Sequence, residues 1–141
     1  MHTINPIKKV KFIYNPSSGE TDVTERLDDI IAIHQDRGYS IVPYRLTFSG
    51  NPYDIIADLD GSYHHVMVAG GDGTVNYIVN LLKRNNIDIP LAVLPTGTAN
   101  DFASLLGVPS NIIRACKAIL EGEITPIDIG KVNGEYFVNV F

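Results

Sequence analysis

The segment of this sequence best suited to chemistry is the glycine-rich pentapeptide Gly70-Gly71-Asp72-Gly73-Thr74, which stands between a short apolar run and a helical pattern. Glycine lets a backbone adopt positive φ angles and approach a ligand closely. The start of the following helix offers amides without intrahelical acceptors and the positive end of the helix dipole. Together these features predict an anion-binding cradle. The pentapeptide alone also allows a tight turn in which Asp72 caps the helix.

Asp72 lies inside this cradle, where a carboxylate would repel a bare phosphate. Its presence makes chemical sense if it holds Mg²⁺, directly or through water, or accepts a proton from a hydroxyl group. The segment is not a dinucleotide fingerprint, because Asn76 stands where a third glycine is needed. The sequence also lacks a Walker loop and the Gly-x-Ser-x-Gly elbow of hydrolases.

Two further polar loops follow predicted strands. They are Asn15-Pro16-Ser17-Ser18-Gly19 and Pro95-Thr96-Gly97-Thr98-Ala99-Asn100-Asp101. Ligands of open α/β sheets bind at the carboxyl ends of strands, so these loops and the glycine loop are expected to converge on one crevice. Taken singly, either loop reads as ordinary turn chemistry. Three such loops at one sheet edge favour a binding site.

The elements that must position these loops form an alternating pattern. Short β-branched runs alternate with helical periods, which predicts βαβ units around a mainly parallel sheet in a three-layer α/β/α domain. Pro43 predicts that the second strand lies at an edge or carries a bulge. The buried face of the helix after the glycine loop is predicted to be Val75, Ile78, Val79 and Leu82. We expect strands at 10–14, 40–47, 66–69 and 91–94, and helices at 23–34, 53–59, 75–82, 100–106 and 112–120.

The end of the sequence changes character. Asn133-Gly134 lies between apolar runs at 127–132 and 135–141, which is a strong signal for an antiparallel hairpin. We therefore expect a nucleotide-binding domain over residues 1–125 and the first strands of a β-rich second domain over 126–141. Because the sequence ends inside an apolar strand, we expect the rest of that domain to be absent.

Three minor groups of residues complete the candidate list. His64 and His65 are expected to be solvated loop residues before a strand, and Cys116 to be buried or half-buried on a helix. Lys8, Lys9 and Lys11 are expected to form a solvated strand end, with membrane contact as the weaker alternative.

Composition narrows the functional classes. Hydrophobic residues make up 45% of the 141 residues and charged residues 19%, which is typical of a folded domain. The formal net charge of -5 argues against a nucleic-acid partner and against strong electrostatic attraction to anionic lipid. One cysteine permits no internal disulfide, and no apolar run approaches the roughly 20 residues of a membrane span. A cytoplasmic protein that only visits membranes is expected.

The three loops resemble those of the diacylglycerol kinase catalytic-domain family, which also contains sphingosine and ceramide kinases and is distantly related to NAD kinases and phosphofructokinases. The resemblance rests on Asn15 to Gly19, on Gly70 to Asn76 and on Pro95 to Phe102, in the right order. The sequence looks most like the soluble bacterial members. The segments Ile127 to Val132 and Tyr136 to Asn139 are similar to the part that leads into their second domain.

The resemblance implies binding of ATP with Mg²⁺ and phosphorylation of diacylglycerol, or a related lipid at a membrane surface, to give phosphatidate. It implies that Thr47, at the end of the second strand, is a nucleotide contact, and that Asp72 is tied to the nucleotide-bound Mg²⁺ or accepts a proton. The nucleotide-binding residues that it implies, together with the loops above, are Asn15, Pro16, Ser17, Ser18, Gly19, Thr47, Gly70, Gly71, Asp72, Gly73, Thr74, Val75, Asn76, Tyr77, Thr96, Gly97, Thr98 and Asn100.

One departure from the family bears on the site, because bacterial members usually carry glutamate where this sequence has Tyr77. The open alternatives are a kinase of another hydroxyl substrate, such as a sphingoid lipid or NAD, and a non-catalytic nucleotide-binding module. The general base and a second metal site are expected in the β-rich domain, so the 141 residues alone should turn over little or no substrate. A homodimer is compatible with the sequence, which does not determine the oligomeric state.

Overall fold

The computed structural model describes residues 6–16, 23–47, 49–94, 96 and 111–122, and the backbone of 128–132 and 135–139. Its main sheet contains β1 (Lys8–Tyr14), β2 (Tyr39–Arg45), β3 (Tyr63–Ala69) and β4 (Leu91–Leu94). The helices are η1 (Thr24–Arg26), α1 (Leu27–Asp36), η2 (Pro52–Ile55), α2 (Asp72–Arg84) and α4 (Ile112–Glu121), and a hairpin follows with β5 (Asp128–Val132) and β6 (Glu135–Asn139).

The four strands of the main sheet are all parallel and lie in the order β2-β1-β3-β4. The predicted mainly parallel α/β fold is therefore confirmed. β2 lies at the edge of the sheet, where Pro43 pairs with Phe12 of β1. This position confirms the edge-strand prediction, because proline has no backbone N–H to donate and is tolerated in a sheet mainly at its edge.

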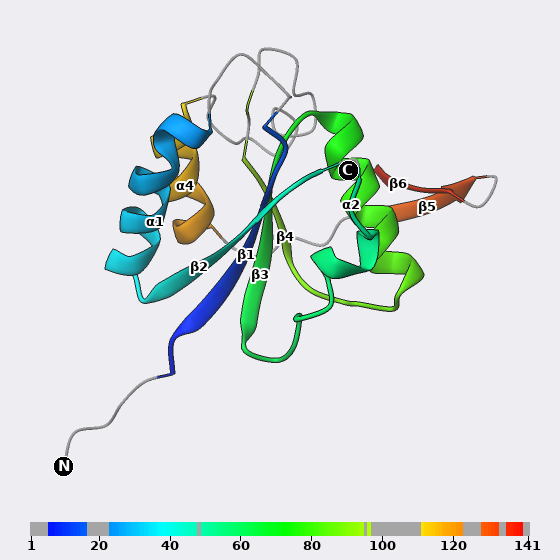
Figure 1. Cartoon of the computed structure of the whole chain (residues 1–141), viewed down its shortest axis with the longest axis horizontal. Coiled ribbons are helices and arrows are strands. Elements are labelled where there is room, and N and C mark those ends of the chain that lie inside the picture. Colours follow the sequence, from blue (N-terminus) through cyan, green and yellow to red (C-terminus); the bar gives the residue numbers. More distant parts are fainter. Residues whose placement is uncertain are drawn as a thin grey trace.

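Helices cover both faces of the sheet, with α1 and α4 on one face and α2 on the other (Figure 1). Alternation along β1 separates two apolar cores, because successive side chains of a strand point to opposite faces. Phe12 packs with Ile30 of α1 and Cys116 of α4. Ile13 packs with the α2 side chains. The buried residues of α2 are Val75, Ile78, Val79, Asn80, Leu81 and Leu82, which include all four that were predicted.

The ends of the helices follow local sequence signals. Gly38 adopts a φ of 83° directly after α1, as expected for a glycine that terminates a helix. Asn111 caps α4, because its side-chain oxygen accepts a hydrogen bond from the amide of Arg114 at 3.1 Å. Cys116 is fully buried, as predicted. The helix expected over 100–106 lies outside the described residues.

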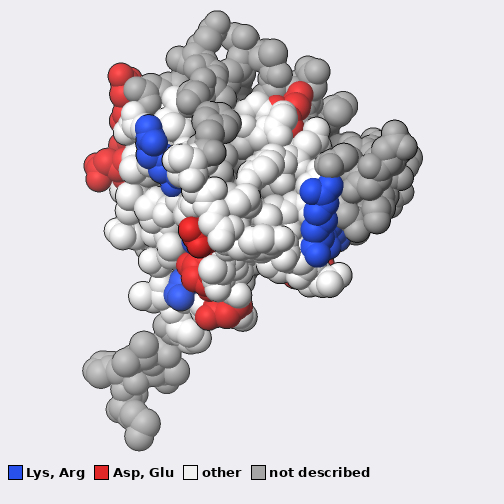
Figure 2. Space-filling view, turned by 45° about the vertical axis from the view of Figure 1, so that its right-hand side comes forward, with Lys and Arg blue, Asp and Glu red and all other residues white. Residues whose placement is uncertain are grey.

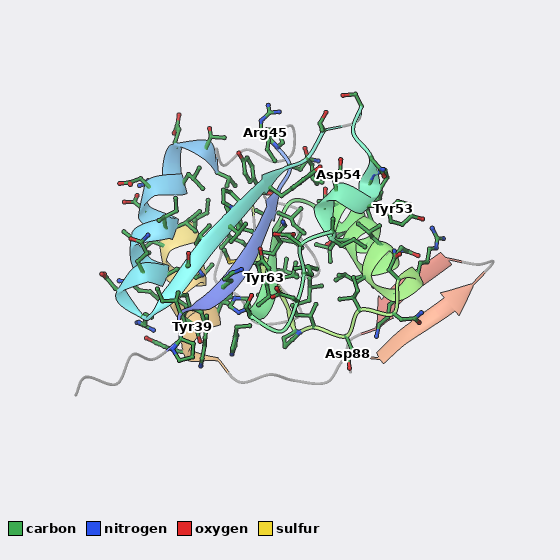
Figure 3. The ribbon with its side chains drawn as sticks, turned by 60° about the horizontal axis from the view of Figure 1, so that its bottom comes forward. Tyr39, Arg45, Tyr53, Asp54, Tyr63 and Asp88 are labelled. Carbon is green, nitrogen blue, oxygen red and sulfur yellow. The ribbon has the colours of Figure 1, made fainter. Side chains whose placement is uncertain are left out.

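The connection from β2 to β3 contains no full helix. The helix predicted over 53–59 is reduced to the short 3₁₀ helix η2, which begins after Asn51 with Pro52 and is continued by turns. Asn51 accepts a hydrogen bond from the amide of Tyr53 at 3.0 Å, while Ile55 and Ile56 enter the core beside α2. We call residues 49–62 the connector, and it covers the α2 side of the sheet near β2 (Figure 3).

Two predictions about single residues are wrong. His64 and His65 lie within β3 rather than in a loop, and His65 is buried. Lys11 does not belong to a solvated strand end, because only 4% of it is exposed. Lys8, in contrast, is exposed as expected.

The C-terminal segment forms the predicted antiparallel hairpin, with Asp128 paired to Asn139 and Val132 to Glu135. Its tip at Asn133-Gly134 lies outside the described residues. The hairpin is a separate sheet, and β6 lies beside α2 (Figure 1). In the part of the chain that the structure describes, no helix is long and apolar enough to span a membrane.

Candidate functional site

The sheet contains a topological switch point between β1 and β3. The chain passes from β1 outward to β2, then returns to the other side of β1 to form β3 and β4. Because all four strands are parallel, their carboxyl ends meet at one edge, which we call the C-terminal edge (Figure 1). In doubly wound sheets, ligands bind outside this edge at the switch point.

Asn15 joins the loops on the two sides of the switch point. Its amide donates a hydrogen bond to the carbonyl oxygen of Ala69 at 3.0 Å, which continues the pairing of β1 with β3 beyond the strand ends. Its side-chain Nδ2 donates to Oγ1 of Thr74 at 3.3 Å. The first polar loop and the glycine loop therefore start from the same place, as the sequence predicted for these two segments.

Glycine is required at position 70 for a steric reason and not because of an unusual backbone angle. It is buried, and a Cβ added to it would lie 2.7 Å from both Cβ and Cγ2 of Thr74. A Cβ at Gly71 or Gly73 would meet no atom of the described residues within 4 Å. The glycines of this loop do not use the positive φ angles that glycine permits, because among the described residues the glycine with positive φ is Gly38.

The glycine loop leads directly into the first turn of α2. Gly71 is the N-cap residue in an extended conformation, and Asp72 is the first residue of the helix. The alternative in which Asp72 acts as the helix cap is therefore wrong. The first amides of an α-helix lack intrahelical acceptors and carry the positive end of the dipole. This helix start, beside open space at Gly71 and Gly73, fits a phosphate group.

Thr47 and Thr96 lie on the two flanks of this helix start. The amide of Leu46 donates to the carbonyl oxygen of Tyr14 at 2.9 Å, so Thr47 follows directly from the paired end of β2. Thr47 is exposed, whereas Thr96, beyond β4, is only 1% exposed. Neighbouring strands are about 4.8 Å apart, so Thr47 lies roughly 10 Å from the end of β3.

The remaining predicted nucleotide contacts divide into four groups. Asn76 and Tyr77 are exposed on α2, and Tyr77 is 45% exposed. The side chain of Val75 is buried in the core and contributes packing instead. Pro16 is exposed after β1. The predicted contacts Ser17, Ser18, Gly19, Gly97, Thr98 and Asn100 lie outside the described residues.

Asp72 places a carboxylate at this edge, in the part of the chain that the structure describes, and this carboxylate could contact a metal ion. Among the described residues, no group of three or more His, Cys, Asp or Glu side chains is arranged to hold a metal. Protein sites for Mg²⁺ commonly use one or two carboxylates together with phosphate oxygens. A half-buried carboxylate at a helix start is compatible with a metal ion that arrives bound to phosphate.

A charge network lies below this edge, in which Lys11 is buried while the side chain of Asp58 is 47% exposed, and sequence reasoning missed it. The Nζ atom of Lys11 lies 2.7 Å from Oδ1 of Asp58, and the hydroxyl of Tyr63 donates to the other oxygen of Asp58. Partial burial acts to raise the pKa of Asp58, but the hydrogen bonds from Lys11 and Tyr63 outweigh it and lower that pKa. The positive charge of Lys11 also lies 5.6 Å from the ring centre of Tyr44.

A cluster of histidines occupies the opposite end of the sheet. The register of β1 and β3 shifts between Lys9 and Val10, which leaves His64 as an extra residue in β3. Such a bulge redirects a side chain, and here His64 and His65 both contact the ring of Tyr39. Burial is the main cause that lowers the pKa of His65, to about 4. This cluster lies far from the candidate site, at the amino ends of the strands.

The fold and the C-terminal edge define a doubly wound α/β domain with a switch point beside a glycine-rich helix start. The chain belongs to the diacylglycerol kinase catalytic domain family, whose model matches residues 9–132. This finding confirms the resemblance stated from the three loops.

Curated relatives and solved structures agree with this assignment. The diacylglycerol kinase of Bacillus subtilis (strain 168) is 35% identical over 136 residues, which cover 95% of this chain and 45% of the relative. A diacylglycerol kinase of Staphylococcus epidermidis is 36% identical, with 94% and 42% covered. A crystal structure of a diacylglycerol kinase from Bacillus anthracis str. Sterne superposes with a TM-score of 0.77 at 32% identity, covering 95% of this chain and 47% of that one. The chain thus spans less than half the length of these relatives.

Proposed function

We propose that this chain is the nucleotide-binding lobe of an ATP-dependent lipid kinase that phosphorylates diacylglycerol to phosphatidate. The observation that carries the proposal is the hydrogen bond between Asn15 and Thr74, which joins the first polar loop to the glycine loop at the switch point. Family membership supports the lipid as acceptor, since the relatives described above are named diacylglycerol kinases.

In this proposal the polyphosphate of ATP lies on the first turn of α2, where Gly71 and Gly73 leave open space. Asp72 holds the Mg²⁺ that the nucleotide brings, and this ion neutralises charge on the phosphates. The nucleoside extends toward Thr47, which lies two strands away at the same edge. Catalysis then rests on positioning the γ-phosphate against the hydroxyl of the lipid.

The domain assignment is part of the proposal. Residues 1–125 form the nucleotide-binding domain, and the hairpin of β5 and β6 begins the β-rich second domain, which supplies the general base and a second metal site. The intact protein works in the cytoplasm and contacts the membrane only peripherally, where its lipid substrate is found. Acidic and basic side chains are dispersed in small groups over the face shown in Figure 2, which fits a transient rather than an electrostatically anchored contact.

The experiment that tests nucleotide binding is calorimetric titration of the chain with Mg·ATP. We expect saturable binding that is lost in Asp72→Ala when Mg²⁺ is present, while Asp88→Ala, which alters an exposed residue remote from the edge, binds normally. If the unmodified chain does not bind Mg·ATP, the proposed function of this lobe is refuted.

The acceptor is tested with the full-length product of the gene. Transfer of labelled phosphate from ATP is measured with diacylglycerol in mixed micelles, with sphingosine and with NAD. We expect diacylglycerol to be the preferred acceptor. A preference for NAD or sphingosine would replace the substrate assignment, and binding of Mg·ATP without any transfer would indicate a regulatory module.

A further inference from the structure

Lys11 is a charged side chain in an unusual place. It lies in the middle of β1, the strand that pairs with both β2 and β3, and it is only 4% exposed. A buried ammonium group is costly unless it is paired and hydrogen-bonded. A buried lysine therefore needs partners that are fixed close to its ammonium group. The contacts of Lys11 show which segments of the chain it fixes.

The ion-pair partner of Lys11 comes from the connector, residues 49–62. Asp58 lies 2.7 Å away at Oδ1, and its other oxygen accepts a hydrogen bond from the hydroxyl of Tyr63 at the start of β3. Figure 3 shows Tyr63 beneath the sheet, on the side of the connector. The connector replaces the crossover helix that usually joins parallel strands, so this ion pair fastens a segment with little regular structure of its own.

A second contact of Lys11 leads toward the C-terminal edge. Its Nζ atom lies 5.6 Å from the ring centre of Tyr44, near the end of β2. The hydroxyl of Tyr44 is 3.9 Å from the position that a Cβ at Gly50 would occupy, and Cγ2 of Thr47 is 3.2 Å from the same position. Tyr44 therefore lies between the charge of Lys11 and the turn that holds Thr47.

Thr47 is in turn tied to the start of the connector. Its Oγ1 lies 3.1 Å from Oγ of Ser49 and accepts a hydrogen bond from the amide of Ser49 at 3.4 Å. Asp58 thus contacts Lys11, the charge of Lys11 faces the ring of Tyr44, and Tyr44 and Thr47 both lie near Gly50. The helix start at Gly71 is held separately, by the pairing of β1 with β3 and by the hydrogen bond from Asn15 to Thr74.

We propose that Lys11 and Asp58 are positioning residues for the nucleoside side of the site: their ion pair, with the ring of Tyr44, holds Thr47 in place at the C-terminal edge. The proposal rests on the nucleotide-binding function proposed above. It predicts a selective defect, because the ion pair acts on the turn at Thr47, whereas the pairing of β1 with β3 and the hydrogen bond from Asn15 to Thr74 hold the phosphate cradle. Loss of the ion pair weakens recognition of the nucleoside and leaves recognition of the polyphosphate intact.

Two ligands separate these effects in calorimetric titrations of the chain. Mg·ATP requires both parts of the site, whereas Mg·tripolyphosphate requires only the cradle. We expect Lys11→Met and Asp58→Asn to weaken binding of Mg·ATP about 3- to 10-fold, which is the usual size of an effect transmitted through packed neighbours. Binding of Mg·tripolyphosphate should change by less than about twofold, which is the scale of an unaffected site.

Two further variants serve as controls for the titrations. Lys11→Arg keeps the charge and should bind Mg·ATP within about twofold of the unmodified chain, since Arg also pairs with carboxylates. Asp60→Asn alters an exposed carboxylate of the same connector that is bonded to Ser62, and it should bind both ligands normally. Circular dichroism and thermal melting verify that each variant is folded at the titration temperature.

The outcomes separate this proposal from the one on which it rests. If the unmodified chain binds neither ligand, the nucleotide-binding function itself fails. If the unmodified chain binds both ligands and folded Lys11→Met loses affinity for both equally, or for neither, the positioning role is refuted while the nucleotide-binding function stands.

Discussion

Asn15 and Thr74 are 59 positions apart in the chain, yet Nδ2 of Asn15 donates a hydrogen bond to Oγ1 of Thr74 at 3.3 Å. The contact crosses the point where the strand order of the sheet reverses, and it brings the loop after β1 to the helix start after β3. A doubly wound sheet opens its ligand crevice at this point. The two residues therefore close the inner side of the candidate nucleotide site.

Removal of this hydrogen bond should weaken nucleotide binding through loss of loop geometry. We expect Asn15→Ala and Thr74→Ala each to reduce the affinity for Mg·ATP about 10-fold, equivalent to about 1.4 kcal/mol. Because the residues contact each other, the double variant should be less impaired than the sum of the single effects, with a coupling energy of about 0.5–1.5 kcal/mol. A double-mutant cycle from calorimetric titrations measures this, and strict additivity would contradict it.

Substitution of Gly70 should disturb the fold, whereas substitution of its neighbour should disturb only binding. In Gly70→Ala the new Cβ would overlap the Cβ of Thr74, which is anchored in α2, so the start of the helix must move. We expect this variant to lose about 1–3 kcal/mol of the free energy of unfolding, measured by urea denaturation. Gly71→Ala has open space and no positive φ, so its stability should change by less than about 0.5 kcal/mol.

The same pair of variants distinguishes folding from function at the glycine loop. Gly71→Ala should still lose affinity for Mg·ATP, because its methyl group enters the space proposed for the phosphates. Normal stability with normal affinity in Gly71→Ala would show that the phosphate does not approach this residue.

The histidine cluster should make stability depend on pH. His65 is buried, and this burial, together with the nearby His64 and His34, lowers its pKa to about 4. Two further groups belong to the surroundings of the cluster: the ring of Tyr39 contacts His65, and the Nζ atom of Lys8 lies over the ring of Tyr39. Because the folded pKa lies below the unfolded value of about 6.5, the fold favours neutral His65. The contribution is complete above pH 6.5 and is lost as the pH falls from about 6.5 to about 4, with a total of about 3 kcal/mol.

A comparison with His65→Met measures this contribution. The free energy of unfolding in urea is determined between pH 7.5 and pH 4.5, and the variant should show a clearly smaller decline over this interval. The ion pair of Asp58 adds to the decline only at lower pH. Because the pKa of Asp58 is lowered in the folded state, the stabilisation by its carboxylate is lost only when the pH falls far enough to protonate it. Equal declines in both proteins would exclude His65 as the source.

Cys116 should be unreactive in the folded chain. It is fully buried between α4 and the sheet, and burial raises the pKa of its thiol to about 12. Because the thiolate is the reactive form, modification by iodoacetamide at pH 8 should be far slower than that of free glutathione and should become rapid in denaturing urea. Mass spectrometry of timed samples measures the rate, and rapid labelling of the native chain would show that α4 detaches from the sheet.

Local signals in the sequence were sufficient for much of the fold. Proline at position 43, glycine at 38 and the apolar spacing of α2 each act over a few residues, so the edge strand, the helix end and the buried face were predicted correctly. The connector was predicted less well, because a 3₁₀ helix that begins at Pro52 and is followed by turns stands where a short helix over 53–59 was expected.

Several features of single residues depended on partners distant in the chain. In the sequence, Lys11 resembles a surface lysine, but in the structure it pairs with Asp58. His64 and His65 resemble loop residues in the sequence, but they lie in β3 at a bulge. The reason for Gly70 lies closer in the chain, in its steric contact with Thr74 of the same loop rather than in its own backbone angle. None of these contacts has a signal in the spacing of neighbouring residues.

The sequence by itself determined the class of fold, the strand ends at which polar loops occur and the family to which the chain belongs, because these follow from short-range periodicity and from motifs. Only the tertiary structure decided which loops meet, which charges are buried and why particular glycines are needed. These properties depend on strand order, since a parallel sheet brings together residues whose separation along the chain carries no information about their separation in space.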